Sequence, residues 1–113
     1  MHEFSIALSI VEISEEHARK ENAGIIREID VEVGELSGVI LDALEFAMES
    51  AFKGTMLENA KYNLIPVQGK AKCLQCQHEF NTDNLITPCP ECNSFRLEII
   101  HGRELRVKSM IID

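Results

Sequence analysis

Residues 73–92 of this 113-residue chain read CLQCQHEFNTDNLITPCPEC and contain every cysteine that the chain has. The four cysteines form two Cys-x2-Cys pairs with twelve residues between them: Cys73, Cys76, Cys89 and Cys92. Two such pairs form a tetrahedral thiolate cage when the turns that carry them face each other. The stretch therefore predicts a structural zinc module, to which the rest of the fold must be connected.

The residues around the second pair fit a tight metal-binding turn. Pro88 and Pro90 stiffen the backbone on both sides of Cys89. Asn93 follows Cys92, at a position that often needs a left-handed backbone, which Asn tolerates better than most residues. Two disulfides are disfavoured in a reducing cytosol, whereas iron on four thiolates and a redox pair remain chemical alternatives. A cage closed by four ligands leaves no open position for catalysis.

The segments before the module alternate between helix and strand patterns. Residues 3–22 carry a broad apolar stripe of helical period. Its members are Phe4, Ile6, Ala7, Leu8, Ile10, Val11 and Ile13. Residues 25–33 alternate apolar and acidic side chains, which predicts a half-buried strand. A second helix is expected from Ser37, as its N-cap, to about Lys53.

Three further strand patterns complete the prediction of fold class. They cover residues 61–67, 97–100 and 104–112, and the last two are expected to form a hairpin through residues 101–103. In the last strand, Leu105, Val107 and Ile111 are expected to face one way. The order predicts an α+β fold, with two helices packed on a small mixed sheet and a zinc-ribbon-like module inserted before the final strand. The domains would be residues 1–69 plus 97–113, and the zinc module of residues 70–96.

The charge of the chain excludes several classes of function. Its formal net charge of −8 lies wholly within residues 1–54, because residues 55–113 hold equal numbers of acidic and basic side chains. An acidic chain is a poor general binder of nucleic acid, whose phosphates demand cations. The sequence contains no apolar run of about 18 residues that could span a bilayer and no signal-peptide pattern. We therefore expect a soluble cytoplasmic protein that binds neither nucleic acid nor membranes.

The N-terminus offers a second set of metal ligands. Met1-His2-Glu3 leads directly into the first predicted helix, whose first N–H groups have no intrahelical acceptor. A free α-amine, the His2 amide and the His2 imidazole can close adjacent chelate rings, with the Glu3 amide next in line. Such a planar nitrogen set suits Ni(II) or Cu(II) better than Zn(II). The simpler alternatives are a solvated histidine at a loose end and an acid that favours a helix N-terminus.

Several motifs together resemble the HypA/HybF family, the nickel metallochaperones of [NiFe]-hydrogenase maturation. They are Met1-His2-Glu3-Phe4-Ser5-Ile6-Ala7, Val33-Gly34-Glu35-Leu36-Ser37-Gly38-Val39, Phe46-Ala47, Gly54-Thr55, the four cysteines and Gly102-Arg103-Glu104-Leu105. The resemblance covers essentially the whole chain, and the combination of an N-terminal Met-His-Glu with the spaced cysteine pairs is highly specific.

The resemblance implies a function, its ligands and its partners. Nickel would bind at the N-terminus with His2 as the essential ligand, joined by the Met1 amine and the backbone amides of His2 and Glu3. Zinc would be structural, on Cys73, Cys76, Cys89 and Cys92. The implied partners are a HypB-type GTPase, the hydrogenase large-subunit precursor and, in some organisms, urease maturation proteins. Because the nickel ligands must lose protons, affinity should fall with decreasing pH.

Two competing functions follow from the same residues. A zinc-ribbon interaction or regulatory module without transferable metal would not depend on residue 2. A small metalloenzyme would instead depend on a carboxylate, but the sequence has no phosphate-binding glycine loop and no nucleophile elbow. We therefore expect a chain that is not an enzyme, either a monomer or a homodimer.

Overall fold

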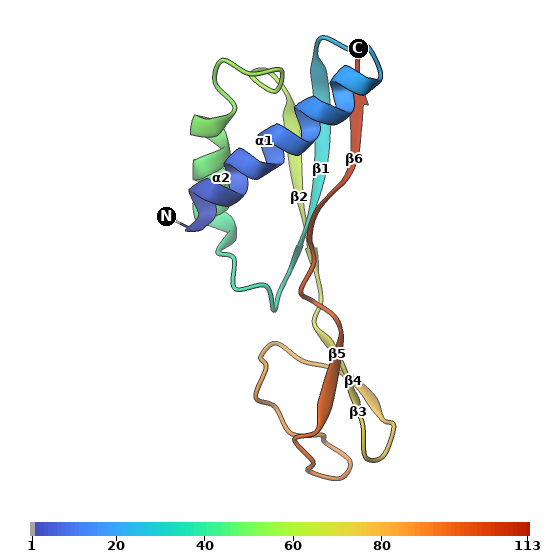
Figure 1. Ribbon diagram of the computed structural model, residues 1–113. Coiled ribbons are helices and arrows are strands. Elements are labelled where there is room, and N and C mark those ends of the chain that lie inside the picture. The colour runs from blue at the N-terminus through green and yellow to red at the C-terminus, as the bar shows by residue number, and fades with distance from the viewer. Residues whose placement is uncertain (1) are drawn as a thin grey trace.

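The computed structural model describes residues 2–113 and contains two helices and two small sheets (Figure 1). The helices are α1 (His2–Lys20) and α2 (Leu41–Ala51), and the strands are β1 (Ile26–Gly34), β2 (Lys61–Val67), β3 (Lys70–Cys73), β4 (Glu79–Asn81), β5 (Leu97–His101) and β6 (Leu105–Ile112). The molecule is elongated, with extents of 53 × 27 × 17 Å. Between residues 2 and 113, no helix is long and apolar enough to cross a membrane.

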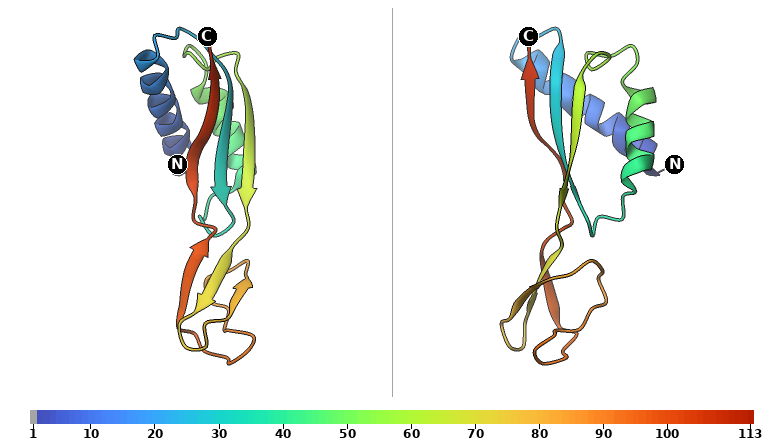
Figure 2. Two further views of the ribbon diagram at one scale, coloured as in Figure 1. Left: turned by 90° about the vertical axis from the view of Figure 1, so that its right-hand side faces the viewer. Right: turned by 180° about the vertical axis from the view of Figure 1, so that it is seen from behind.

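The first sheet has the order β2-β1-β6 and carries both helices on one face (Figure 2). Strand β1 pairs in parallel with β2 and antiparallel with β6, so the expected mixed sheet is confirmed. The alternation in β1 places Ile29, Val31 and Val33 in the core, each at most 2% exposed. They pack with buried side chains from both helices, which makes the expected α+β arrangement correct.

The second sheet has the order β4-β3-β5 and lies in the cysteine-containing part of the chain. The expected hairpin between the last two strands is therefore wrong, because β5 pairs with β3 while β6 pairs with β1. Two backbone carbonyls at the crossing accept hydrogen bonds from the end of β1 and from the segment that follows it. Gly34 donates its N–H to the backbone carbonyl oxygen of Glu104 at 2.6 Å, and Leu36 donates its N–H to that of Gly102 at 2.6 Å. Residues 97–101 thus extend the sheet of the cysteine module, beyond its expected limit at residue 96.

The second helix begins three residues later than expected. Its N-cap is Ile40, which has no side-chain cap, while Ser37 lies in a turn where its hydroxyl accepts the Val39 N–H at 3.2 Å. Gly38 follows Ser37 with a φ of +81°, which a helix cannot contain. The side-chain preference of Ser for capping is therefore satisfied by a local turn instead.

On α1 and on β6, fewer of the apolar side chains are buried in the structure than the sequence pattern predicted. On α1, Leu8 and Ile13 are 48% and 57% exposed, because the sheet covers only part of the stripe. On β6, Ile111 is 56% exposed, although it was expected to share a face with Val107. Val107 pairs with Val31 and Ser109 with Asp30, so one extra residue lies between them. This bulge shifts the alternation by one position.

Three glycines allow the chain to pass between the two sheets at a narrow waist. A Cβ on Gly34 would lie 2.0 Å from the Gly102 carbonyl oxygen, and one on Gly102 would lie 2.7 Å from the Gly69 Cα. Gly102 also has a φ of +116°, which side-chain-bearing residues rarely adopt. The close backbone approach at the waist therefore requires glycine at these positions.

Replacing Gly102 with alanine should destabilise the protein. The strained backbone alone costs about 1–3 kcal/mol, and the contact with Gly69 adds to this. The matched control is Gly24→Ala, because a Cβ on Gly24 meets nothing within 4 Å and the backbone there is not left-handed. Urea unfolding should show a lower midpoint for Gly102→Ala than for Gly24→Ala, and equal midpoints would contradict this account of the waist.

Candidate metal centres

The four cysteines come together at the far end of the second sheet from the waist. Their sulfurs all lie within 4.8 Å of one another, with Sγ–Sγ distances of 3.5 Å for Cys73–Cys92 and 3.6 Å for Cys76–Cys89. A tetrahedral site with Zn–S bonds of ~2.3 Å separates its sulfurs by about 3.8 Å. The arrangement of the four thiols thus fits a tetrahedral zinc ion.

The two cysteine pairs sit in matched turns. Gln77 donates its N–H to the Cys73 oxygen at 2.9 Å, and Asn93 donates to the Cys89 oxygen at 2.8 Å. Both residues have a left-handed backbone, with φ values of +70° and +63°. The expected left-handed backbone at Asn93 is confirmed. The first turn has the same left-handed backbone at Gln77, a residue type from which this conformation was not expected.

The thiols differ in how readily they lose a proton: although a backbone N–H favours the thiolates of Cys76 and Cys92, burial and the neighbouring thiols raise the pKa values of both. The backbone N–H of Cys76 points at the Cys73 sulfur at 3.5 Å and lowers the pKa of that thiol to about 6. Only the thiolate is a strong metal ligand. Cys73 and Cys89 are fully buried, while Cys76 is exposed, so one side of the thiol cluster is packed within the module and the other side is accessible to solvent.

The N-terminal residues occupy the first turn of α1, on the helical layer of the other sheet. His2 is exposed and begins the helix, so its backbone N–H and that of Glu3 have no intrahelical acceptor. The Glu3 carboxylate is directed toward the segment before α2, where the Ile40 N–H lies 3.5 Å from Oε2. Met1 lies outside the described residues. His2 and Glu3 thus lie together, and the cysteines lie in a separate part of the molecule (Figure 1).

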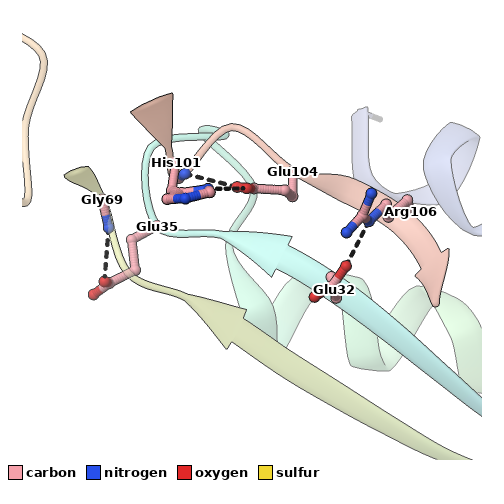
Figure 3. A network of polar contacts seen from close by, with 7 residues as sticks. Glu32, Glu35, Gly69, His101, Glu104 and Arg106 are labelled. Atoms are coloured by element: carbon pink, nitrogen blue, oxygen red, sulfur yellow. Dashed lines mark hydrogen bonds and ion pairs between the residues drawn. The ribbon is translucent and has the colours of Figure 1, made fainter. Parts of the chain in front are cut away.

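A polar network at the waist lies between these two regions (Figure 3). Glu104 Oε1 accepts the Gly102 N–H at 2.6 Å, and Oε2 lies 3.3 Å from His101 Nδ1. The N–H of Glu104 itself and that of Gly102 lower the pKa of this carboxyl. On the neighbouring segment, Glu35 accepts the Gly69 N–H at 3.3 Å. Sequence reasoning missed this network; its only signal was a glutamate two residues after a glycine.

The fold and the thiol cluster define a small metal-binding protein, built from an α+β domain and a four-cysteine module suited to zinc. A family model described as "Hydrogenase/urease nickel incorporation, metallochaperone, hypA" matches residues 1–112. The chain therefore belongs to the HypA family of nickel metallochaperones for hydrogenase maturation.

Individual proteins of this family are similar to the chain over nearly its full length. The chain is 46% identical over 112 residues to the hydrogenase maturation factor HypA of Parabacteroides distasonis, covering 99% of this chain and 97% of that one. It is 42% identical to the factor of the same name from Geobacter sp. strain M21, covering 100% of both. The solution structure of the Ni metallochaperone HypA from Helicobacter pylori matches with a TM-score of 0.73 at 26% identity, covering 97% of this chain and 96% of that chain.

Proposed function

We propose that this chain binds Ni(II) at its N-terminus and hands it to a maturing [NiFe]-hydrogenase through protein–protein contact. The ligands would be the His2 imidazole, the Met1 amine and the backbone amides of His2 and Glu3. Nickel is the cargo of this protein, and no chemical step is catalysed. The observation that carries the proposal is the exposed His2 at the first residue of α1, in a chain that belongs to this family.

The position of His2 supports a site that can both select and release a metal. Free amides at the helix start are available to a planar nitrogen set, which favours Ni(II) over Zn(II). The contact of the Glu3 side chain with the Ile40 amide favours the Glu3 backbone, rather than its carboxylate, as a nickel ligand. An exposed terminal chelate can also be approached directly by an accepting protein.

Zinc has a different role in this proposal. It would be held by Cys73, Cys76, Cys89 and Cys92 and would stabilise the second sheet. Zinc would not be cargo, because four thiolates hold it too tightly for routine transfer. The functional units are then a nickel-binding α/β domain of residues 1–69 plus 97–113 and a zinc module of residues 70–96. Because strand β5 (Leu97–His101) pairs with β3, residues 97–101 belong with the zinc module, and the boundary after the module moves from residue 96 to residue 101.

The partners and the compartment follow from the same function. A HypB-type GTPase and the hydrogenase large-subunit precursor would flank the transfer step, and urease maturation proteins would be alternative recipients, in line with the hydrogenase/urease description of the family. The cytoplasm suits this role because reducing conditions keep the four thiols free for zinc. Hydrogenase maturation is the function that the matching relatives bear in their names.

Extending the chain ahead of Met1 tests the terminal chelate. A Gly-Ser dipeptide added before Met1 moves the α-amine away, so Ni(II) affinity measured by calorimetry should fall by about 10-fold or more. The control carries the same dipeptide after Asp113, far from His2 in the sequence, and should bind nickel like the unmodified chain. Equal affinities of the two extended chains would refute a site that uses the Met1 amine.

A further inference from the structure

A groove follows the seam between α1 and β6. Its first part has a volume of about 260 Å³ and extends from His2 to Ile13 on the helix, facing Leu105 and Val107 of β6. Its second part, of about 350 Å³, continues from Ile13 to His17 along the same strand. Because the two parts share Ile13 and Val107, they form one groove that begins at the proposed nickel ligand.

The first part of the groove is mostly apolar, and the groove borders an open sheet edge. Ile13 is 57% exposed and Leu105 is 38% exposed, although both are large apolar side chains. Strand β6 is at the margin of the sheet and pairs only with β1 within the described chain. An edge strand offers unpaired N–H and C=O groups to a further strand.

The open edge is cationic, in contrast with the acidic half of the chain that contains α1. Arg106 Nε donates to Glu32 Oε1 of β1 at 2.5 Å on the inner side (Figure 3) and remains largely exposed. Lys108, the extra residue of the bulge, is exposed, and its charge acts on the Asp30 carboxylate of β1. On the side of β6 that pairs with β1, every second residue of β1 is acidic: Glu28, Asp30 and Glu32. A strand that met the outer side would gain the same charge complementarity.

We propose that an extended segment of the nickel-accepting partner protein, with alternating apolar and acidic side chains, adds to the edge of β6. Its apolar side chains fill the groove against Ile13 and Leu105, and its acidic side chains face Arg106 and Lys108. This seats the accepting protein beside His2 and rests on the proposed function. A second copy of this chain fits less well, because pairing two β6 strands would oppose like charges.

A capped peptide, Val-Glu-Val-Asp-Val-Glu-Val, is the probe for this docking site, with Val-Lys-Val-Lys-Val-Lys-Val as its matched cationic twin. Titration into the ¹⁵N-labelled zinc-bound chain should shift amide resonances of Leu105–Val107 and of the groove side of α1, and the cationic twin should bind at least about 10-fold more weakly. Equal binding of the two peptides, or shifts centred on β2, would overturn the proposal. Concentration-dependent dimerisation through β6 would also overturn it.

Two variants on the same helix separate groove binding from general surface effects. Ile13→Glu puts a charge into the groove and should abolish binding of the acidic peptide. Leu8→Glu changes a similarly exposed side chain that does not line the groove, and binding should be retained. Lys108→Glu should weaken the acidic peptide and favour the cationic one. Retained binding in Ile13→Glu would contradict the assigned site.

Nickel calorimetry on the same variants keeps this proposal distinct from the proposed function. Normal nickel binding in the unmodified chain without peptide binding would overturn the groove alone. Peptide binding at β6 without any nickel binding at the N-terminus would refute the metal-delivery function, and with it the assignment of the docked segment to a nickel acceptor.

Discussion

Substituting alanine for His2 should abolish high-affinity Ni(II) binding while leaving zinc binding and the fold unchanged. The imidazole is the only side-chain nitrogen in the first turn of α1, so its loss breaks one chelate ring and removes a ligand that amides cannot replace. The side chain is exposed, and removal of an exposed side chain changes stability by about 0.5 kcal/mol or less. Calorimetry should therefore show the loss of nickel binding without a change in the urea midpoint.

The matched control for this substitution is His17→Ala. His17 is also an exposed histidine on α1, but it lies in the last turn, at the other end of the helix. This variant should bind Ni(II) with the affinity of the unmodified chain. If nickel binding survives in His2→Ala or falls equally in both variants, the first turn of α1 is not the nickel site.

Removal of zinc should unfold the cysteine module before the rest of the molecule. In the part of the chain from residue 70 to residue 101, the buried side chains are Ala71, Cys73, Thr82 and Cys89. The large cluster of buried apolar side chains lies outside this part, in the first sheet, the two helices and the connection between α2 and β2. A module with so little core depends on its metal, and structural zinc contributes on the order of 10 kcal/mol in small zinc domains. The two parts should therefore separate in stability.

Hydrogen exchange with and without a zinc chelator measures this effect. After chelation, the amides of Gln77 and Asn93, which close the two cysteine turns, should exchange rapidly. The amides of Ile29 and Val31 in the central strand of the first sheet should stay protected. A uniform rise in exchange along the chain would show a single cooperative unit and contradict a zinc-dependent module.

Local patterns predicted the parts of the structure that local chemistry controls. The alternation around Ile29 is preserved in β1, and the spacing of the cysteines anticipated the paired turns, including the left-handed Asn93. These features depend on residues within a few positions of one another. Pro66 obeys a local rule of the same kind: a proline has no N–H to donate, and its strand β2 lies at an edge of the first sheet.

Features that depend on distant residues could not be predicted in this way. The short segment after His101 suits a hairpin equally well, and only the hydrogen bonds from Gly34 and Leu36 to its carbonyls decide that the chain continues into the other sheet. The bulge at Lys108 likewise arises from register against β1. The polar network of Glu104 forms only when these segments meet at the waist, so the spacing of Gly102 and Glu104 alone could not predict it.

Native mass spectrometry of the unmodified chain, with and without added Ni(II), tests the central claim most directly. The account predicts one zinc per chain before addition, held by the four cysteines, and one zinc plus one nickel afterwards. A chain that holds zinc but never gains nickel would contradict the claim, as would one in which nickel only replaces zinc, because delivery requires a second, separate site at the N-terminus.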